Sequence, residues 1–151
     1  AKREEWFKVI EKVKKAGDID FAVVSQSEKV IDKKGISWAI KKALEIGLKK
    51  LKLDPAQCEV LLDGGLYAPI QYKNQKTIIK GDAKEMVIAL ASICAKVSRD
   101  RKMRKWGKKY PRYGFEVHKG YGTRAHYRAI QKAGLHPIHR RSFCKSLILT
   151  K

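Results

Sequence analysis

The stretch IIKGDAKEMVIALASICAKVSRD, residues 78–100, decides the fold of this chain. It opens with a short β-branched run, turns at Gly81, and continues as a long predicted helix that is apolar on nearly every side, which is typical of a buried helix. Asp82 and Glu85 have the spacing of an N-cap residue and its reciprocal partner, so the sequence predicts that the helix starts at Asp82. Lys96 interrupts the apolar surface. A buried helix with a carboxylate at its entry and a cation on its side is a candidate functional site.

Length and charge limit the classes of protein to consider. At 151 residues the chain is long enough for one domain with a real core, and 44% hydrophobic with 33% charged residues is a globular composition. Thirty-five Lys and Arg against 15 Asp and Glu give a formal net charge of +20. Such a field attracts polyanions, of which nucleic acid is the commonest. The alternative is a lysine-rich surface that only keeps the protein in solution.

Cysteine usage and hydropathy bear on the compartment. Cys58, Cys94 and Cys144 are odd in number and lack the spacing of metal ligands, so we expect free thiols in a reducing compartment. No apolar run approaches the length of a membrane span, and no signal peptide is visible. The expected location is the cytoplasm, without a membrane partner.

The first third of the chain predicts two helices and a strand. Residues 1–16 show one apolar helical face at Trp6, Val9, Ile10 and Val13, with a stop at Gly17. A short buried strand is expected at 21–24. Residues 36–51 form the second amphipathic helix, with lysines on its outer face. Because the chain opens on a helix without an initiator Met, we expect it to begin partway through a longer protein.

The middle of the chain predicts a parallel sheet with a site at its edge. Residues 60–62 are apolar without alternation, which is typical of a strand buried on both faces, and 76–79 form another short strand. Helix and strand alternate, so we expect parallel pairing in an α/β arrangement. Ligands bind beyond the carboxyl ends of such strands, and Asp63 lies there. The alternative is that Asp63 and Gly64 serve only as turn residues.

The last third is basic and rich in aromatic residues. Lysines and arginines crowd residues 99–109, and Pro111 breaks the helix. Residues 113–123 form a glycine-punctuated loop, in which Gly120 and Gly122 would let a sugar or base come close to the ring of Tyr121. A last helix over 124–133 is capped by Thr123 and ended by Gly134, and residues 139–143 are again basic.

Five motifs in order carry a resemblance to a known family. They are LLDG at 61–64, IKGD at 79–82, ASICAKVSRD at 91–100, YGF at 113–115 with HKGYGT at 118–123, and HRRSF at 139–143. Together they resemble ribonuclease HII, the type 2 ribonuclease H family, and the match covers essentially the whole chain.

The resemblance implies a ribonuclease H-like mixed sheet flanked by helices, with a small helical C-terminal part. We expect one domain over 1–151, with a sheet-and-helix core at 1–105 and a substrate-binding part at 106–151. Four carboxylates bind Mg²⁺ or Mn²⁺ in the family, and the third and fourth fall on Asp63 and Asp82. Two hard cations about 3.5–4 Å apart need oxygen ligands from several elements, as these positions would provide. Tyr121 corresponds to the tyrosine that packs against a deoxyribose beside the cleavage site.

Departures from the family pattern matter equally. The Asp-Glu-Ala-Gly-Arg-Gly motif that supplies the first two carboxylates, and that senses the ribose 2′-hydroxyl, is missing from this chain, so its first strands are expected to be absent. Gly35 replaces a usual Asn, and Leu90 replaces a usual Ala.

Other polar residues have weaker assignments. Lys96, Lys119, Arg140 and Arg141 are candidate phosphate contacts, although each alone could be a solvated surface charge. His118 is expected to order its loop. The remaining histidines, His126, His136 and His139, lack the spacing of a zinc site. Asp100 follows Arg99 inside the helix, where we expect an ion pair and no metal role.

The resemblance implies endonucleolytic hydrolysis of the RNA strand of RNA/DNA hybrids, and cleavage 5′ of ribonucleotides embedded in duplex DNA, by two metal ions. With two of four ligands, this chain alone is expected to be weakly active or inactive. The alternatives are a non-catalytic basic nucleic-acid-binding module and a ribosomal-type RNA-binding protein, the latter disfavoured by the large apolar helix. We expect a monomer, or a monomer completed by a separate N-terminal segment.

Overall fold

The computed structural model describes residues 2–145, which form a mixed α/β protein divided into two compact units. Of the described residues, 2–26 and 36–97 form the first unit, and 27–35 and 98–145 form the second. The mixed α/β fold class predicted from the sequence is confirmed.

The first unit contains a parallel strand pair with helices packed on it. Strands β1 (Val60–Asp63) and β2 (Gln75–Ile78) pair in parallel, with Leu62 opposite Thr77 and Asp63 opposite Ile78. Both strands and their parallel pairing were predicted. The helical elements of this unit are α1 (Lys2–Ala16), α3 (Ile36–Leu51), the 3-10 turn η1 (Gly81–Ala83) and the first half of α4 (Met86–Lys109).

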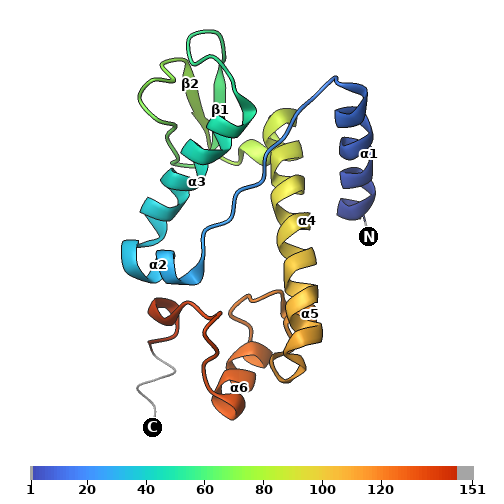
Figure 1. The fold of residues 1–151 in the computed structure, drawn as a ribbon, viewed down its shortest axis with the longest axis vertical. Helices are drawn as coiled ribbons and strands as arrows, with labels where there is room; N and C mark the ends of the chain where they lie inside the picture. The colour runs from blue at the N-terminus through green and yellow to red at the C-terminus, as the bar shows by residue number, and fades with distance from the viewer. Residues whose placement is uncertain (1, 146–151) are drawn as a thin grey trace. The chain divides into compact units, whose positions relative to one another are not determined.

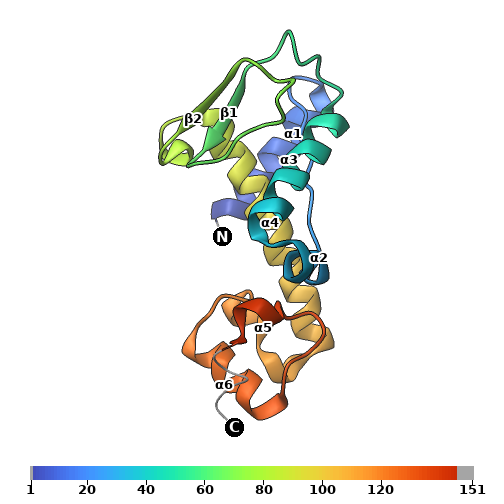
Figure 2. The ribbon, with the colours of Figure 1, turned by 90° about the vertical axis from the view of Figure 1, so that its left-hand side faces the viewer.

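Two apolar clusters hold this unit together. In the first, Leu44 and Leu48 of α3 pack against Leu62 of β1 and Tyr72 of the loop that joins the strands, so α3 lies alongside the strand pair (Figure 1). In the second, side chains of α1 contact the first half of α4, so the two helices lie side by side (Figure 1), and α1 passes behind α4 in the view of Figure 2. The buried members of this second cluster are Phe7, Ile10, Cys94 and Val97.

The second unit is helical. It contains α2 (Glu28–Lys34), the last turns of α4, η2 (Pro111–Tyr113), α5 (Phe115–His118), α6 (Arg124–Ala133) and η3 (Arg141–Phe143). The predicted ends of the last two long helices are confirmed: α4 stops at Lys109 before Pro111, and Thr123 caps α6 by accepting a hydrogen bond from the His126 amide at 3.2 Å. Gly134 ends α6 with φ +77°.

Two local predictions are wrong. Asp82 does not begin the long helix, which starts at Met86; Asp82 lies instead in η1, whose Gly81 carbonyl accepts the amide of Glu85. Residues 21–24 do not form a strand. A strand requires a neighbour, and no described strand pairs with these residues. Phe21 and Val23 pack instead on the cluster around Phe7.

Three predictions of burial also need correction. On α1 the buried side chains are Phe7 and Ile10, while Trp6 and Val9 are exposed, because Phe7 contacts the ring of Phe21. Helix α4 is buried on one side only: Met86 is 78% exposed. In β1 only Leu62 is fully buried, because α3 covers one face of the strand. None of the described helices combines the length and apolar character that crossing a bilayer requires.

Candidate active site

Asp63 lies at the carboxyl end of β1, where the sequence placed it. Its backbone is fixed by the strand pair, since Asp63 is opposite Ile78 and the amide of Gly64 donates to the Ile78 carbonyl at 3.0 Å. Gly64 then turns the chain with φ +65°, a left-handed conformation that glycine adopts at little cost. The Asp63 side chain is exposed beyond the strand.

Asp82 is brought next to Asp63 by the residue before it. The amide of Gly81 donates a hydrogen bond to Oδ1 of Asp63 at 2.8 Å, so the two carboxylates lie on adjoining backbone although they are nineteen positions apart. Lys80 turns the chain into η1 with φ +56°. The carboxyl end of β1 and the 3-10 turn η1 thus place two acidic side chains at one edge of the sheet.

Gly81 is required at this crossing by its surroundings, and the sequence alone did not show why. It is buried, and a Cβ there would lie 2.6 Å from Cδ1 of Ile88 and 3.4 Å from Oδ1 of Asp63. Ile88 is 7% exposed, so its side chain has little freedom to move aside. The backbone can therefore reach the Asp63 carboxylate only without a side chain at this position.

Asp82 also has a cationic neighbour. Oδ2 of Asp82 lies 3.5 Å from Nζ of Lys96, which comes from α4, and both side chains are more than 40% exposed. Exposed ion pairs of this kind contribute about 0–1 kcal/mol. Lys96, predicted as a phosphate contact, thus lies beside a predicted metal ligand, where it can balance charge or bind an anion.

The donor chemistry of the pair suits a hard divalent cation, but the number of donors is small. Carboxylate oxygens are the ligands Mg²⁺ and Mn²⁺ prefer, and one oxygen of Asp63 is already occupied by the Gly81 amide. Within residues 2–145 no group of three or more His, Cys, Asp or Glu side chains could hold a metal ion. The pair therefore fits as part of a ligand set. Asp100 belongs to the second unit, and Asp63 and Asp82 belong to the first.

Tyr121 lies in the second unit, in a loop held at several points. Tyr121 is 54% exposed, and the guanidinium of Arg99 lies 4.0 Å from the centre of its ring. Arg99 also donates from Nη2 to the Lys119 carbonyl at 3.2 Å. The sequence analysis assigned Arg99 to a basic run and to an ion pair with Asp100; the loop itself gave no signal that Arg99 stacks on the tyrosine.

The glycines beside Tyr121 also pack against side chains of the protein. A Cβ at Gly120 would lie 3.1 Å from Cε of Met103, and one at Gly122 would lie 2.5 Å from the hydroxyl of Tyr127. The absent Cβ atoms thus make room for Met103 and Tyr127, and the access of a sugar or base to the ring stays a prediction. The exposed Tyr121 ring remains available.

The other predicted phosphate contacts lie in the second unit. Lys119 bonds through Nζ to the Glu116 carbonyl, and the guanidinium of Arg140 lies 4.1 Å from the ring centre of Phe143. Arg141 is exposed, and its amide donates to Asp32 Oδ2 at 2.8 Å. Asp32 also accepts from the amide and hydroxyl of Ser142, at 3.0 and 2.5 Å, which fixes η3 from a residue more than 100 positions earlier.

The three cysteines are free thiols, as the sequence predicts. Cys94 and Cys144 are buried and Cys58 is half-buried, and none of the three forms a disulfide. Burial raises the pKa of the Cys94 and Cys144 thiols.

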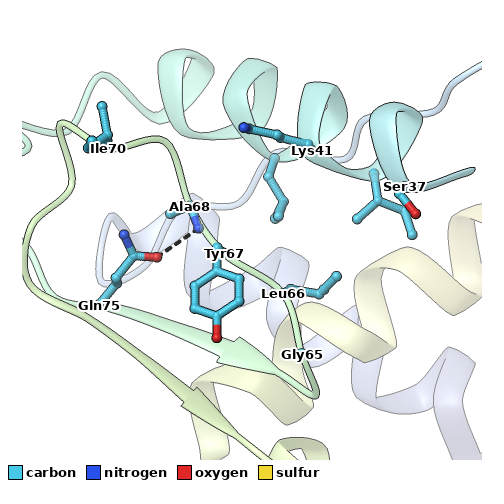
Figure 3. Close-up of a pocket in the computed structure, with 10 residues that line it drawn as sticks. Ser37, Lys41, Gly65, Leu66, Tyr67, Ala68, Ile70 and Gln75 are labelled. Carbon is cyan, nitrogen blue, oxygen red and sulfur yellow. Dashed lines mark hydrogen bonds between the residues drawn. The ribbon is translucent and has the colours of Figure 1, made fainter. Parts of the chain in front are cut away.

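A cavity of about 460 Å³ lies between α3 and the loop that follows β1. It is lined mainly by apolar side chains, with Lys41 at its side and Leu66 and Tyr67 from the loop (Figure 3). The amide oxygen of Gln75 accepts the Ala68 amide at 2.8 Å and holds the loop in place. Asp63 and Asp82 do not line this cavity, so it is separate from the carboxylate pair.

Taken together, fold and site define a strongly basic α/β protein with two adjoining carboxylates beyond the end of a parallel strand. Residues 1–146 match the family model described as Ribonuclease HII. The chain belongs to the ribonuclease HII family.

Individual relatives support this family assignment. Ribonuclease HII of Acetivibrio thermocellus is 46% identical over 147 residues, which cover 97% of this chain and 55% of that protein. The Clostridioides difficile protein of the same name is 43% identical over 98% of this chain and 55% of its own length. Ribonuclease HII of Endomicrobium trichonymphae is 44% identical over 94% of this chain and 65% of its own length. The chain thus spans between about half and two thirds of the length of these relatives.

Proposed function

We propose that this chain is the part of a divalent-metal-dependent endonuclease that carries two of its four metal-binding carboxylates. The substrate would be the RNA strand of RNA/DNA hybrids, and the enzyme would also cut 5′ of ribonucleotides embedded in duplex DNA. The observation that carries the proposal is the hydrogen bond from the Gly81 amide to Asp63, because it brings Asp63 and Asp82 to one edge of the sheet. Family membership supports it.

Asp63 and Asp82 would hold Mg²⁺ or Mn²⁺ together with an acidic pair supplied by a segment outside this sequence. Bound ions of this kind activate a water molecule and stabilise the charge that develops on the phosphate oxygens. Lys96 would offset the negative charge of Asp82 before substrate arrives. The exposed ring of Tyr121 would pack against a deoxyribose, and Lys119, Arg140 and Arg141 would contact phosphates. This assigns the carboxylates to residues 1–105 and most substrate contacts to 106–151, in a cytoplasmic monomer.

One observation favours a second candidate, a basic nucleic-acid-binding module without catalysis. The described part of the chain offers no cluster of three metal-ligating side chains, and the net charge of +20 by itself supports binding to duplexes.

The experiment is cleavage of an end-labelled RNA/DNA hybrid in Mg²⁺ by the 151-residue chain, compared with the same chain joined to an N-terminal segment that bears the acidic pair. We expect binding without appreciable cleavage by the chain alone, and metal-dependent cleavage by the joined protein. Robust cleavage by the chain alone would contradict the role given to the missing pair. Binding without cleavage by both proteins would favour the second candidate.

A further inference from the structure

The second unit contains a cluster of three buried histidines that the proposed function does not use. His118, His126 and His139 are 8, 7 and 6% exposed, and all three rings surround Phe115, with ring centres 5.5 to 5.8 Å from its own. The rings of His118 and His126 stack at 4.1 Å. No buried side-chain nitrogen or oxygen among the described residues lacks a hydrogen-bond partner, so every imidazole nitrogen here has an assigned neighbour.

Those neighbours determine where each proton must be. The carbonyl of Tyr121 can only accept, so Nδ1 of His126, 3.0 Å away, carries the proton and Nε2 does not. Nδ1 of His139 lies 2.9 Å from the amide and 3.1 Å from the carbonyl of His136. Because the bare Nε2 of His126 needs a donor, Nδ1 of His139 accepts from the amide and the proton of His139 is on Nε2. That proton points at the bare Nε2 of His126, 3.2 Å away. The three bonds form one chain that ends on the Tyr121 carbonyl.

His118 holds the same loop from the other side. Its Nδ1 accepts the amide of Gly120 at 3.1 Å, and its Nε2 donates to the Tyr113 carbonyl at 2.6 Å. The amide of Tyr121 in turn donates to the His118 carbonyl at 2.9 Å. Both backbone groups of Tyr121 are thus bonded to this cluster, and the arrangement is complete with three neutral imidazoles.

We infer that His118, His126 and His139 are positioning residues for Tyr121, that the bonds of His126 and His139 hold it only while these two are neutral, and that acid releases the loop. The functional half of this inference rests on the role proposed for Tyr121 above. A proton added to Nε2 of His126 would face the proton on Nε2 of His139. His139 could accept it only by moving its own proton to Nδ1, toward the His136 carbonyl at 3.1 Å, and the amide of His136 would then lose its acceptor.

The surroundings of the cluster oppose charge. The titratable groups that act on His126 are His118 and His139, and those that act on His139 are His136 and His118, so these neighbours include no carboxylate that could balance an added proton. The Tyr113 ring packs edge-on against His139, and its hydroxyl donates to the Gly134 carbonyl at 3.0 Å. Burial lowers the pKa of both His126 and His139, backbone carbonyls oppose this shift, and the other histidines add to it.

The direction of the pH effect follows from this. A histidine whose pKa is lower in the folded state takes up protons on unfolding, so the folded loop is favoured above the ordinary histidine pKa of about 6.5 and destabilised as pH falls below it. If these histidines were simply part of a solvated basic surface, nucleic-acid binding would strengthen in acid, because they would become cationic.

The first measurement is NMR of the imidazole nitrogens in the full chain without nucleic acid. At pH 7.5 we expect the proton on Nε2 of His118 and His139 and on Nδ1 of His126. Below about pH 6 we expect the Gly120 and Tyr121 amides to lose protection, measured as the ratio of the intrinsic to the observed exchange rate at each pH. A proton on Nε2 of His126 at pH 7.5, or protection of these amides that does not change with pH, would overturn the inference.

The second measurement is binding of an RNA–DNA junction duplex at constant salt. Base or sugar stacking on an aromatic ring predicts that Tyr121→Ala weakens binding about fivefold to tenfold at pH 7.5, and we expect less than about twofold at pH 5.5. His126→Phe, which keeps ring packing but cannot donate, should abolish the Tyr121 effect at both pH values. An unchanged Tyr121 effect in acid would overturn the inference.

Two further variants separate positioning from folding. His139→Gln retains a donor toward His126 but cannot take up a proton, so it should preserve binding and extend the Tyr121 effect to lower pH. The matched comparison is His136→Gln, whose side chain lies outside the chain of bonds but lowers the pKa of His139; it should keep the Tyr121 effect at pH 7.5 and move the pH profile only slightly, toward higher pH. If the NMR results hold but Tyr121→Ala has no effect at pH 7.5, the loop clamp stands and the substrate role proposed for Tyr121 fails.

Discussion

Asp63 and Asp82 carry the catalytic proposal at the scale of single residues. In the protein joined to its acidic N-terminal segment, Asp63→Asn and Asp82→Asn should each abolish most Mg²⁺-dependent turnover and leave duplex binding nearly unchanged, because each change removes a metal-ligand charge but few phosphate contacts. Single-turnover cleavage and equilibrium binding measure the two effects separately. Asp100→Asn is the control and should be milder. Equal damage from all three would mean that the ligand assignment is wrong.

Gly81 predicts a stability effect that a neighbouring glycine should not show. In Gly81→Ala the new Cβ would crowd Ile88 and the Asp63 carboxylate, so we expect a loss of about 1–3 kcal/mol of unfolding free energy, as for other overpacked sites. Gly65→Ala is the matched control, since nothing lies within 4 Å of a Cβ there. Chemical denaturation of both variants tests this, and equal stabilities would show that η1 adjusts freely.

At the scale of elements, Asp32 links α2 to η3. The hydroxyl and amide of Ser142 and the amide of Arg141 lower the pKa of Asp32, against a smaller opposing effect of burial. A carboxyl with a lowered folded-state pKa stabilises the fold above its ordinary pKa of about 3.9, and this is lost as pH falls through the lower folded value. Asp32→Asn should therefore speed exchange of the Arg141 and Ser142 amides at neutral pH. Asp18→Asn, an exposed change in the other unit, should not.

Elements also show where sequence reasoning succeeds. Residues 36–51 were correctly predicted because the apolar stripe of α3 is repeated over four turns and agrees with its buried contacts. The apolar run at 21–24 has the composition of a strand, but none of the strands described in residues 2–145 lies beside it. The start of α4 was misplaced because the local capping signal at Asp82 competes with a tertiary bond, from the Gly81 amide to Asp63, that no local pattern reveals.

The functional residues likewise divide into those that local sequence could predict and those that it could not. Asp63 could be predicted because a strand end and a turn are local features. The histidine cluster could not, since His118 and His139 are 21 positions apart and become neighbours only when α5, α6 and the following loop pack around Phe115. The crowding of four histidines into residues 118–139 was the one signal available, and spacing for zinc was the wrong test to apply to it.

For the whole molecule, charge is the dominant property. With +20 net charge, binding to an RNA/DNA duplex should be governed by phosphate contacts. If six or more phosphates are neutralised, affinity should fall by about three decades or more between 50 and 200 mM salt. Titration of a labelled duplex over that range measures the slope. A flat profile would remove the electrostatic basis of the proposal.

The three free thiols give the molecule a set of internal reporters. Cys94 lies in the α1–α4 cluster of the first unit, Cys144 is buried in the second, and Cys58 is only half-buried. Alkylating reagents require thiolate and access, so Cys58 should react first, and Cys94 and Cys144 only when their surroundings open. The rates of modification at these two positions, followed by mass spectrometry in rising denaturant, would show whether the two units open together or one before the other.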